Sequence, residues 1–77
     1  MFLMFKKLKI KRKIKQAKKN IILLEEKRSR SQAALVTAIL SQKSPDDEDV
    51  EYFNHFTSLI ETERNRMHDL MKDLEEL

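Results

Sequence analysis

Few side chains in this 77-residue sequence could do chemistry, and their spacing limits what that chemistry can be. The sequence contains two histidines, His55 and His68, and no cysteine. Glu51 and His55 are four residues apart, so on a helix they would share a face and could both bind a metal ion. No third or fourth ligand follows at a recognisable spacing. We therefore expect both histidines to lie in water or at the edge of a helix interface, and we predict no metal site.

The other candidate groups do not combine into a catalytic site. The acidic run from Asp46 to Asp49 lacks the glycine and the alternating ligands of a calcium loop. The serines have neither a paired base nor a strained turn that would expose a nucleophile. The chain has no glycine, which removes phosphate-binding and dinucleotide-binding loops. The sequence predicts a non-enzymatic protein with no cofactor and no small-molecule substrate.

A dense basic segment between residues 6 and 19 is the best functional lead. Its positive charge would attract phosphate, whether on nucleic acid or on lipid headgroups. A basic region that leads into heptads resembles the basic-zipper arrangement, but the residues with which that family reads bases are missing, so only phosphate contact is expected. The phosphate-binding candidates are Lys6, Lys7, Lys9, Lys11, Arg12, Lys13, Lys15, Lys18 and Lys19.

Three interpretations of the basic segment stay open. Its lysines could simply complement the acidic part of the same protein. They could bind nucleic acid through phosphate contacts. The chain could also be a peripheral membrane-surface protein anchored by residues 1–8, with lysines on anionic lipid. The apolar side chains expected to insert are Phe2, Leu3, Phe5 and Leu8.

One break divides the chain into the two helices that must position these groups. The only proline is Pro45, and no other helix breaker occurs. Ser44 suits the N-cap, Pro45 the first helical position and Asp47 the acid of a capping box. We therefore predict a helix over about 3–42, a turn at 43–45 and a second helix over about 45–76.

Apolar residues recur at spacings of three and four in both predicted helices, which is the pattern of one helix face. A polar interruption around Arg28 divides the first stripe, and Glu63 is the charged exception in the second. The first stripe comprises Ile10, Ile14, Ala17, Ile21 and Leu24, resuming at Leu35 and Ile39. The second comprises Phe53, Phe56, Ile60, Glu63, Met67, Leu70, Leu74 and Leu77.

An antiparallel hairpin brings these stripes together. In the predicted register Phe53 lies opposite Leu35 and Met67 opposite Ile21, while Ile60 falls near Arg28. The polar interruptions then meet, so that Arg28 can pair with Glu63 and fix the register.

The charges favour the same arrangement. Residues 1–43 contain 13 basic and 2 acidic residues, whereas residues 44–77 contain 3 basic and 11 acidic residues. We expect the acids at the end of the second helix to pair with lysines of the first and so to select its orientation. These acids are Asp69, Asp73, Glu75 and Glu76, and the lysines are Lys11, Lys13, Lys15, Lys18 and Lys19.

The fold class predicted is therefore all-α: a single domain over 1–77 made of two long amphipathic helices. Two helices bury little surface, so we expect the hairpin to pair into a dimeric four-helix bundle or coiled coil, or to dock on another protein as a regulator or adaptor. Whether the helices pair within one chain or are swapped between two stays open. No secretory signal or membrane-spanning stretch is visible, so a cytoplasmic location is expected. The predicted partner-binding surface comprises Leu35, Val36, Ile39, Leu40, Phe53, Phe56, Leu59 and Ile60.

Overall fold

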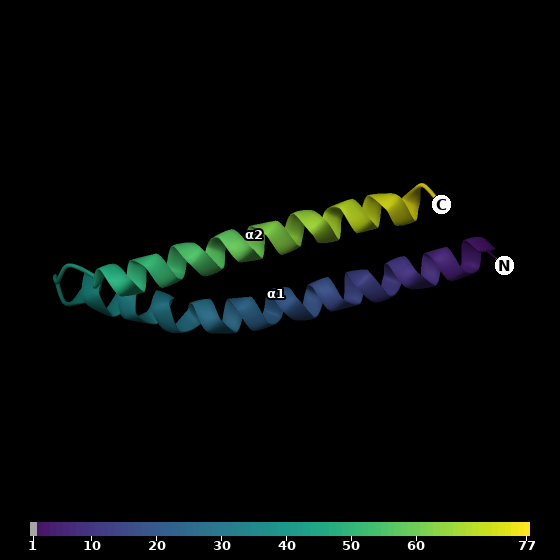
Figure 1. Cartoon of the computed structure of the whole chain (residues 1–77). Helices are drawn as coiled ribbons and strands as arrows, with labels where there is room; N and C mark the ends of the chain where they lie inside the picture. The colour runs from purple at the N-terminus through teal and green to yellow at the C-terminus, as the bar shows by residue number, and fades with distance from the viewer. Residues whose placement is uncertain (1) are drawn as a thin grey trace.

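The protein is an antiparallel hairpin of two long helices, which confirms the predicted fold class (Figure 1). The computed structural model describes residues 2–77. Helix α1 runs from Phe2 to Leu40 and helix α2 from Asp47 to Glu75, and the described residues contain no strand. Neither helix contains glycine or proline, which explains how both can run so far without a break. The hairpin is a rod with extents of 60 × 17 × 15 Å.

The end of α1 is closed by a Schellman motif in which glutamine occupies the left-handed position. Gln42 has a φ of 57°. Its backbone N–H donates to the carbonyl of Ile39 at 3.1 Å, and the N–H of Lys43 donates to the carbonyl of Ala38 at 2.9 Å. These bonds satisfy carbonyls that the last turn of a helix leaves free. Because glycine is absent from the chain, a residue with a Cβ has to adopt a conformation that disfavours it.

The predicted cap of α2 is wrong. The helix begins at Asp47 rather than Pro45, and its N-cap is Asp46, which is extended (φ −65°, ψ 136°) and makes no side-chain capping hydrogen bond. The chain that leaves α1 has to cross the 8–10 Å that typically separates two packed helix axes, and residues 43–46 make this crossing without helical structure. Three acids, from Asp47 to Asp49, do lie in the first turn, where the helix dipole favours negative charge.

A narrow apolar core runs between the helices along the predicted stripes. In α1 the residues Ile14, Ala17 and Ile21 are buried, and Ala17 has no exposed surface at all. In α2 the most buried residue is Ile60, which is 1% exposed. Every member of the α2 stripe is buried or half-buried. The three-and-four spacing therefore identifies the contact face of both helices, but this face is only about one side chain wide.

The helices do not pair in the predicted register. Arg28 was expected beside Ile60, yet its guanidinium donates to the hydroxyl of Thr57 at 3.3 Å and lies 5.6 Å from the centre of the Phe53 ring. Both partners are at least three residues closer to the loop than Ile60. The shift relative to the prediction is thus about one helical turn at this point.

The predicted ion pair between Arg28 and Glu63 is also wrong, because the shifted register gives both residues other partners. Glu63 accepts a hydrogen bond from the Asn20 amide at 3.2 Å and pairs with Arg66, one turn further along α2, at 3.5 Å. The Nε of Arg28 is buried and has no hydrogen-bond partner. The contacts that join the helices at mid-hairpin are therefore Arg28 over the Phe53 ring and the hydrogen bond between the Asn20 carboxamide and the Glu63 carboxylate.

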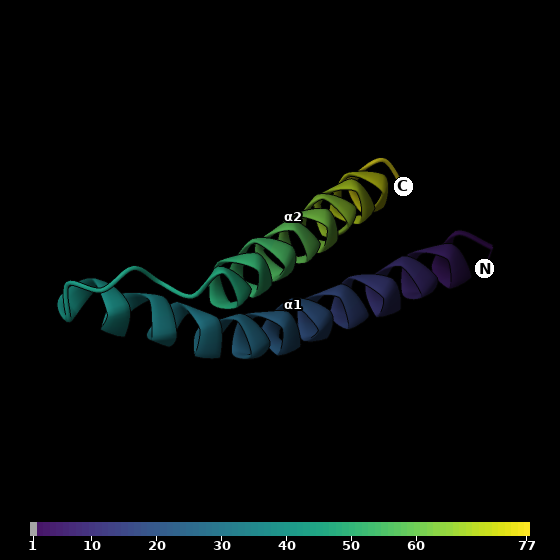
Figure 2. The same cartoon turned by 60° about the vertical axis from the view of Figure 1, so that its left-hand side comes forward.

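The path of the loop explains the shift. Figure 2 shows the last turn of α1 lying beyond the first turn of α2, with the loop running back between them. Extended residues advance about 3.3 Å each, so residues 43–46 carry the chain back along α1 before α2 starts. At the other end of the rod, the first turns of α1 extend past the end of α2 (Figure 1 and Figure 2).

Candidate interaction surfaces

Four of the eight predicted partner-binding side chains are exposed, and they do not form one uniform patch. Val36, Ile39 and Leu40 are 48%, 66% and 79% exposed at the end of α1. The exposure of Leu59 on α2 is 38%. Three further predicted members, Leu35, Phe53 and Phe56, are half-buried between the helices.

Ile60 has to be removed from the predicted partner surface. Its side chain is almost completely buried in the hairpin core, because it belongs to the α2 stripe that faces α1. No partner can reach it while the helices stay paired. Its role is to hold the hairpin together.

Two exposed apolar residues of α1, Ile22 and Leu23, were not among the predicted surface residues. They are 57% and 55% exposed. The signal that could have found them is the unbroken apolar run from Ile21 to Leu24, since four consecutive residues of a helix point in four directions and cannot all face one neighbour. Leu23 lines a shallow groove of about 320 Å³ whose other walls include Leu59 and Thr62 of α2.

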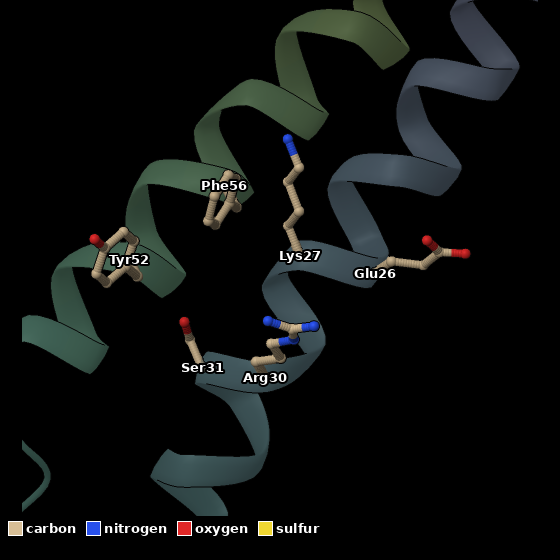
Figure 3. Close-up of a pocket in the computed structure, with 6 residues that line it drawn as sticks. All are labelled: Glu26, Lys27, Arg30, Ser31, Tyr52 and Phe56. Carbon is tan, nitrogen blue, oxygen red and sulfur yellow. The ribbon is translucent and has the colours of Figure 1, made fainter.

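A second groove, of about 550 Å³, opens on the hairpin surface where α1 passes the first turns of α2. Figure 3 shows Tyr52 and Phe56 projecting from α2 and Ser31 rising from α1 toward them. The remaining lining residues are Glu26, Lys27 and Arg30, of which Glu26 points away from α2 (Figure 3). The two grooves share Lys27. The two grooves therefore adjoin at this side chain, and together they form a strip along the junction of the helices.

These grooves do not bring together groups for acid–base or nucleophilic chemistry. Ser31 is buried, and the groove that it lines contains no histidine or cysteine. His55 packs edge-on against Phe56, with ring centres 5.4 Å apart, and lines a separate depression with Glu48 and Glu51. Within residues 2–77 no cluster of three or more His, Cys, Asp or Glu side chains is arranged to hold a metal ion.

All nine phosphate-binding candidates, from Lys6 to Lys19, are exposed on α1. The predicted ion pairs between these residues and the acids at the end of α2 do not form. In the described part of the chain, the ion pairs are Arg64–Glu25, at 3.0 Å, and the Arg66–Glu63 pair within α2. The stems of three of the lysines line a groove beside Met71 and Leu74, yet their ammonium groups reach no carboxylate. The basic segment thus keeps its charge available to an external anion.

The predicted membrane-anchoring side chains are also exposed. Phe2, Leu3, Phe5 and Leu8 are 79%, 55%, 70% and 47% exposed, and Met4 among them is 74% exposed. Met1 belongs to the predicted anchor but lies outside the described residues. Among the helices of residues 2–77, neither has an apolar stretch that would reach across a bilayer.

No protein-family model, curated protein or solved structure matches the chain. Function therefore has to be inferred from the surfaces of the hairpin itself.

Proposed function

We propose that the protein is a non-enzymatic helical interaction module, a regulator or adaptor that works by binding protein, with a second copy of itself as the first candidate. The proposed contact is the loop-end surface, which we define as Val36, Ile39 and Leu40 of α1 and Val50 of α2. Its members are 37% to 79% exposed. The surface thus offers apolar area that the hairpin does not use.

The imbalance between buried and exposed apolar side chains carries this proposal. Four apolar residues are buried in the described chain, whereas thirteen large apolar residues are exposed. Small domains are marginally stable even with a complete core. Burying one large apolar side chain contributes about 1.5–3 kcal/mol, so covering the loop-end surface would add substantially to the stability of the fold.

A second hairpin is a suitable cover because two hairpins make a four-helix bundle, in which each helix packs against two neighbours. The strip that contains Leu23, Leu59 and Phe56 would give the added helices a groove along the junction of α1 and α2. Such a bundle would bury the apolar edge that a two-helix contact leaves in water.

Sedimentation velocity over a range of protein concentrations tests the proposal. We expect the wild-type protein to associate as its concentration rises, and the Ile39→Asp/Leu40→Asp variant to dissociate at concentrations at least about tenfold higher, because two exposed apolar contacts are replaced by charge. Ile22→Asp is the matched control, since it changes another exposed apolar residue of α1, outside the loop-end surface. It should leave association unchanged.

The unfolding of the monomer distinguishes the two kinds of protein partner. A wild-type protein that stays monomeric and unfolds cooperatively would contradict self-association and remove the main reason for a protein partner. A monomer that unfolds gradually, without a cooperative transition, would instead favour a different protein as the partner that completes the fold.

A further inference from the structure

The first two turns of α1 combine exposed apolar side chains with a position outside the hairpin contact. They extend past the end of α2 (Figure 1). Phe2, Met4 and Phe5 are 70% to 79% exposed, far more than side chains that pack on a neighbouring helix. A shallow depression of about 380 Å³ on this segment has Met4, Phe5 and Leu8 as its apolar lining and Lys7 and Lys11 at its edge.

One exposed face of α1 continues from this apolar segment into the basic segment. Successive members of the face are separated by four or three residues, which aligns them on one side of a helix. We call it the α1 outer face, and its residues are Met4, Leu8, Lys11, Lys15, Lys18 and Ile22, all of them exposed. It is apolar at its beginning, basic along its middle and apolar again at Ile22.

Charge on the two sides of the hairpin is strongly unequal. Residues 2–24 include no acidic side chain, and the basic residues of this segment form no ion pair within the described chain. The acids gather on α2, which packs against Ile14, Ala17 and Ile21 of α1. The α1 outer face lies to the side of this contact, where its three lysines line a groove with Met71 and Leu74 of α2. The α2 residues that line this groove are apolar and carry no negative charge.

We propose that the α1 outer face docks along the surface of an anionic lipid bilayer. Met4 and Leu8 of this face, together with Phe5, which lines the same depression, enter the boundary between headgroups and acyl chains. Lys11, Lys15 and Lys18 contact the headgroups. Helices with an apolar edge beside lysines bind membranes in this way, and each lysine or arginine near an anionic surface strengthens the attraction. The long lysine stems let the ammonium groups reach the headgroups while the methylenes stay near the apolar layer.

Nucleic acid would use only part of this face. A phosphate backbone would contact the lysines, but it offers no apolar layer to Met4 and Leu8. Lipid accounts for both kinds of residue on the same face. This inference does not depend on association through the loop-end surface.

Co-sedimentation with vesicles tests the docking. We expect the full chain to pellet with vesicles of phosphatidylserine and phosphatidylcholine, to pellet much less with phosphatidylcholine alone, and to be released as salt is raised. The Phe5→Ser/Leu8→Ser variant should bind at least about tenfold more weakly, since both apolar contacts with lipid are lost. Both side chains are substantially exposed, so circular dichroism should show that the variant stays helical.

The matched control is Val50→Ser/Leu59→Ser, which changes two exposed apolar residues of α2. It should bind the anionic vesicles as the wild-type protein does. If this variant no longer self-associates but binds lipid normally, the loop-end surface and the α1 outer face act separately.

Fluorescence gives a second and independent measurement, because the chain has no tryptophan. Phe5→Trp should shift its emission to shorter wavelength with anionic vesicles and should be quenched by brominated acyl chains. Asn65→Trp, at an exposed position of α2, should show neither effect.

Several outcomes would overturn the inference. These are no binding to anionic vesicles, equal binding to phosphatidylcholine, and undiminished binding by the Phe5→Ser/Leu8→Ser variant. Salt-sensitive binding to duplex DNA without binding to vesicles would also overturn it, and would assign the lysines to nucleic acid instead.

Discussion

At the scale of single residues, Gln42 shows how the chain turns without glycine. Its left-handed conformation lets the last carbonyls of α1 find donors. For a residue with a Cβ this conformation is unfavourable by about 1–2 kcal/mol. The hairpin loop therefore contains a local strain that the hydrogen bonds of the Schellman motif have to offset.

Replacing this residue should stabilise the fold. We predict that Gln42→Gly raises the free energy of unfolding by about 1 kcal/mol, because glycine adopts positive φ without a steric penalty. Urea unfolding followed by far-ultraviolet circular dichroism measures the change. Ser41→Gly is the control and should give no gain, since the left-handed residue is its neighbour. Equal midpoints for wild type and Gln42→Gly would show that the strain is absent.

Arg28 is the residue at which sequence reasoning fails most clearly. The sequence shows a polar interruption of the α1 stripe and a single acid, Glu63, in the α2 stripe, and pairing the two is the simplest solution. The structure instead places Arg28 over Phe53, while Asn20 takes Glu63. An arginine can satisfy itself on a hydroxyl or an aromatic ring as well as on a carboxylate, so its partner is not determined by charge alone.

At the scale of elements, the sequence predicts both helices and their contact faces, but not how they are aligned. Periodicity locates Ile14, Ala17 and Ile21 in the core, since burial follows the helical repeat. The alignment of the helices depends on the path of the six loop residues, 41–46, and on whether Ser44 or Asp46 is the N-cap of α2. The local preferences of those residues allow more than one start for α2, and each would slide the stripes by part of a turn.

The exposure of the candidate surface residues could likewise be predicted only in part. Exposure of Leu40 and the basic residues could be predicted, because they lie outside the stripes. Ile39 belongs to the first stripe, yet it is exposed, because it lies near the end of α1 and α2 begins only at Asp47. Burial of Ile60 follows from its place in the α2 stripe, so its inclusion in the predicted partner surface was inconsistent with that stripe. The exposure of Leu23 could be predicted, because four consecutive apolar residues of a helix cannot all face one neighbour.

The unpaired lysines of α1 lead to a prediction about salt. Lys7, Lys11, Lys15 and Lys19 follow one another at intervals of four residues, and each such like-charge pair destabilises a helix by about 0.2–0.5 kcal/mol. Raising sodium chloride to about 1 M, where the Debye length is about 3 Å, should screen this repulsion and raise the melting temperature. Thermal unfolding by circular dichroism measures it.

The Lys11→Gln/Lys15→Gln variant supplies the control for this effect. It should melt higher than the wild-type protein at low salt and respond less to added salt. A melting temperature that falls as salt is added would mean that ion pairs between the helices stabilise the hairpin after all.

At the scale of the whole molecule, the path of the chain is a hairpin in which α1 and α2 pair within one polypeptide. A swapped dimer would use the same helix contacts between two chains. Because the chain has no cysteine, introduced thiols can tell the two apart without background.

We predict that Asn20→Cys/Glu63→Cys, treated with a short thiol-reactive cross-linker in dilute solution, gives a product within one chain. The two original side chains are hydrogen-bonded at 3.2 Å, so the thiols lie within reach of one another. Mass spectrometry of the product identifies the linkage. Asn20→Cys/Asn65→Cys serves as the control and should react more slowly, because Asn65 is exposed on α2. Products that link two chains at every dilution would indicate swapping.

The length of the rod has a consequence for how its two surfaces would work together. The loop-end surface and the apolar start of α1 lie at opposite ends of a molecule 60 Å long, so ligands bound at the two ends would not touch. The two binding events would instead be coupled through local concentration. A protein bound at the loop end would be held close to the surface that α1 occupies, and its concentration there would rise. Confinement of this kind can strengthen a second binding event by about 10²–10⁴-fold without any new contact. A two-helix hairpin with a sparse core would be sufficient for this coupling, because the coupling depends on the separation of two surfaces and not on a closed binding site.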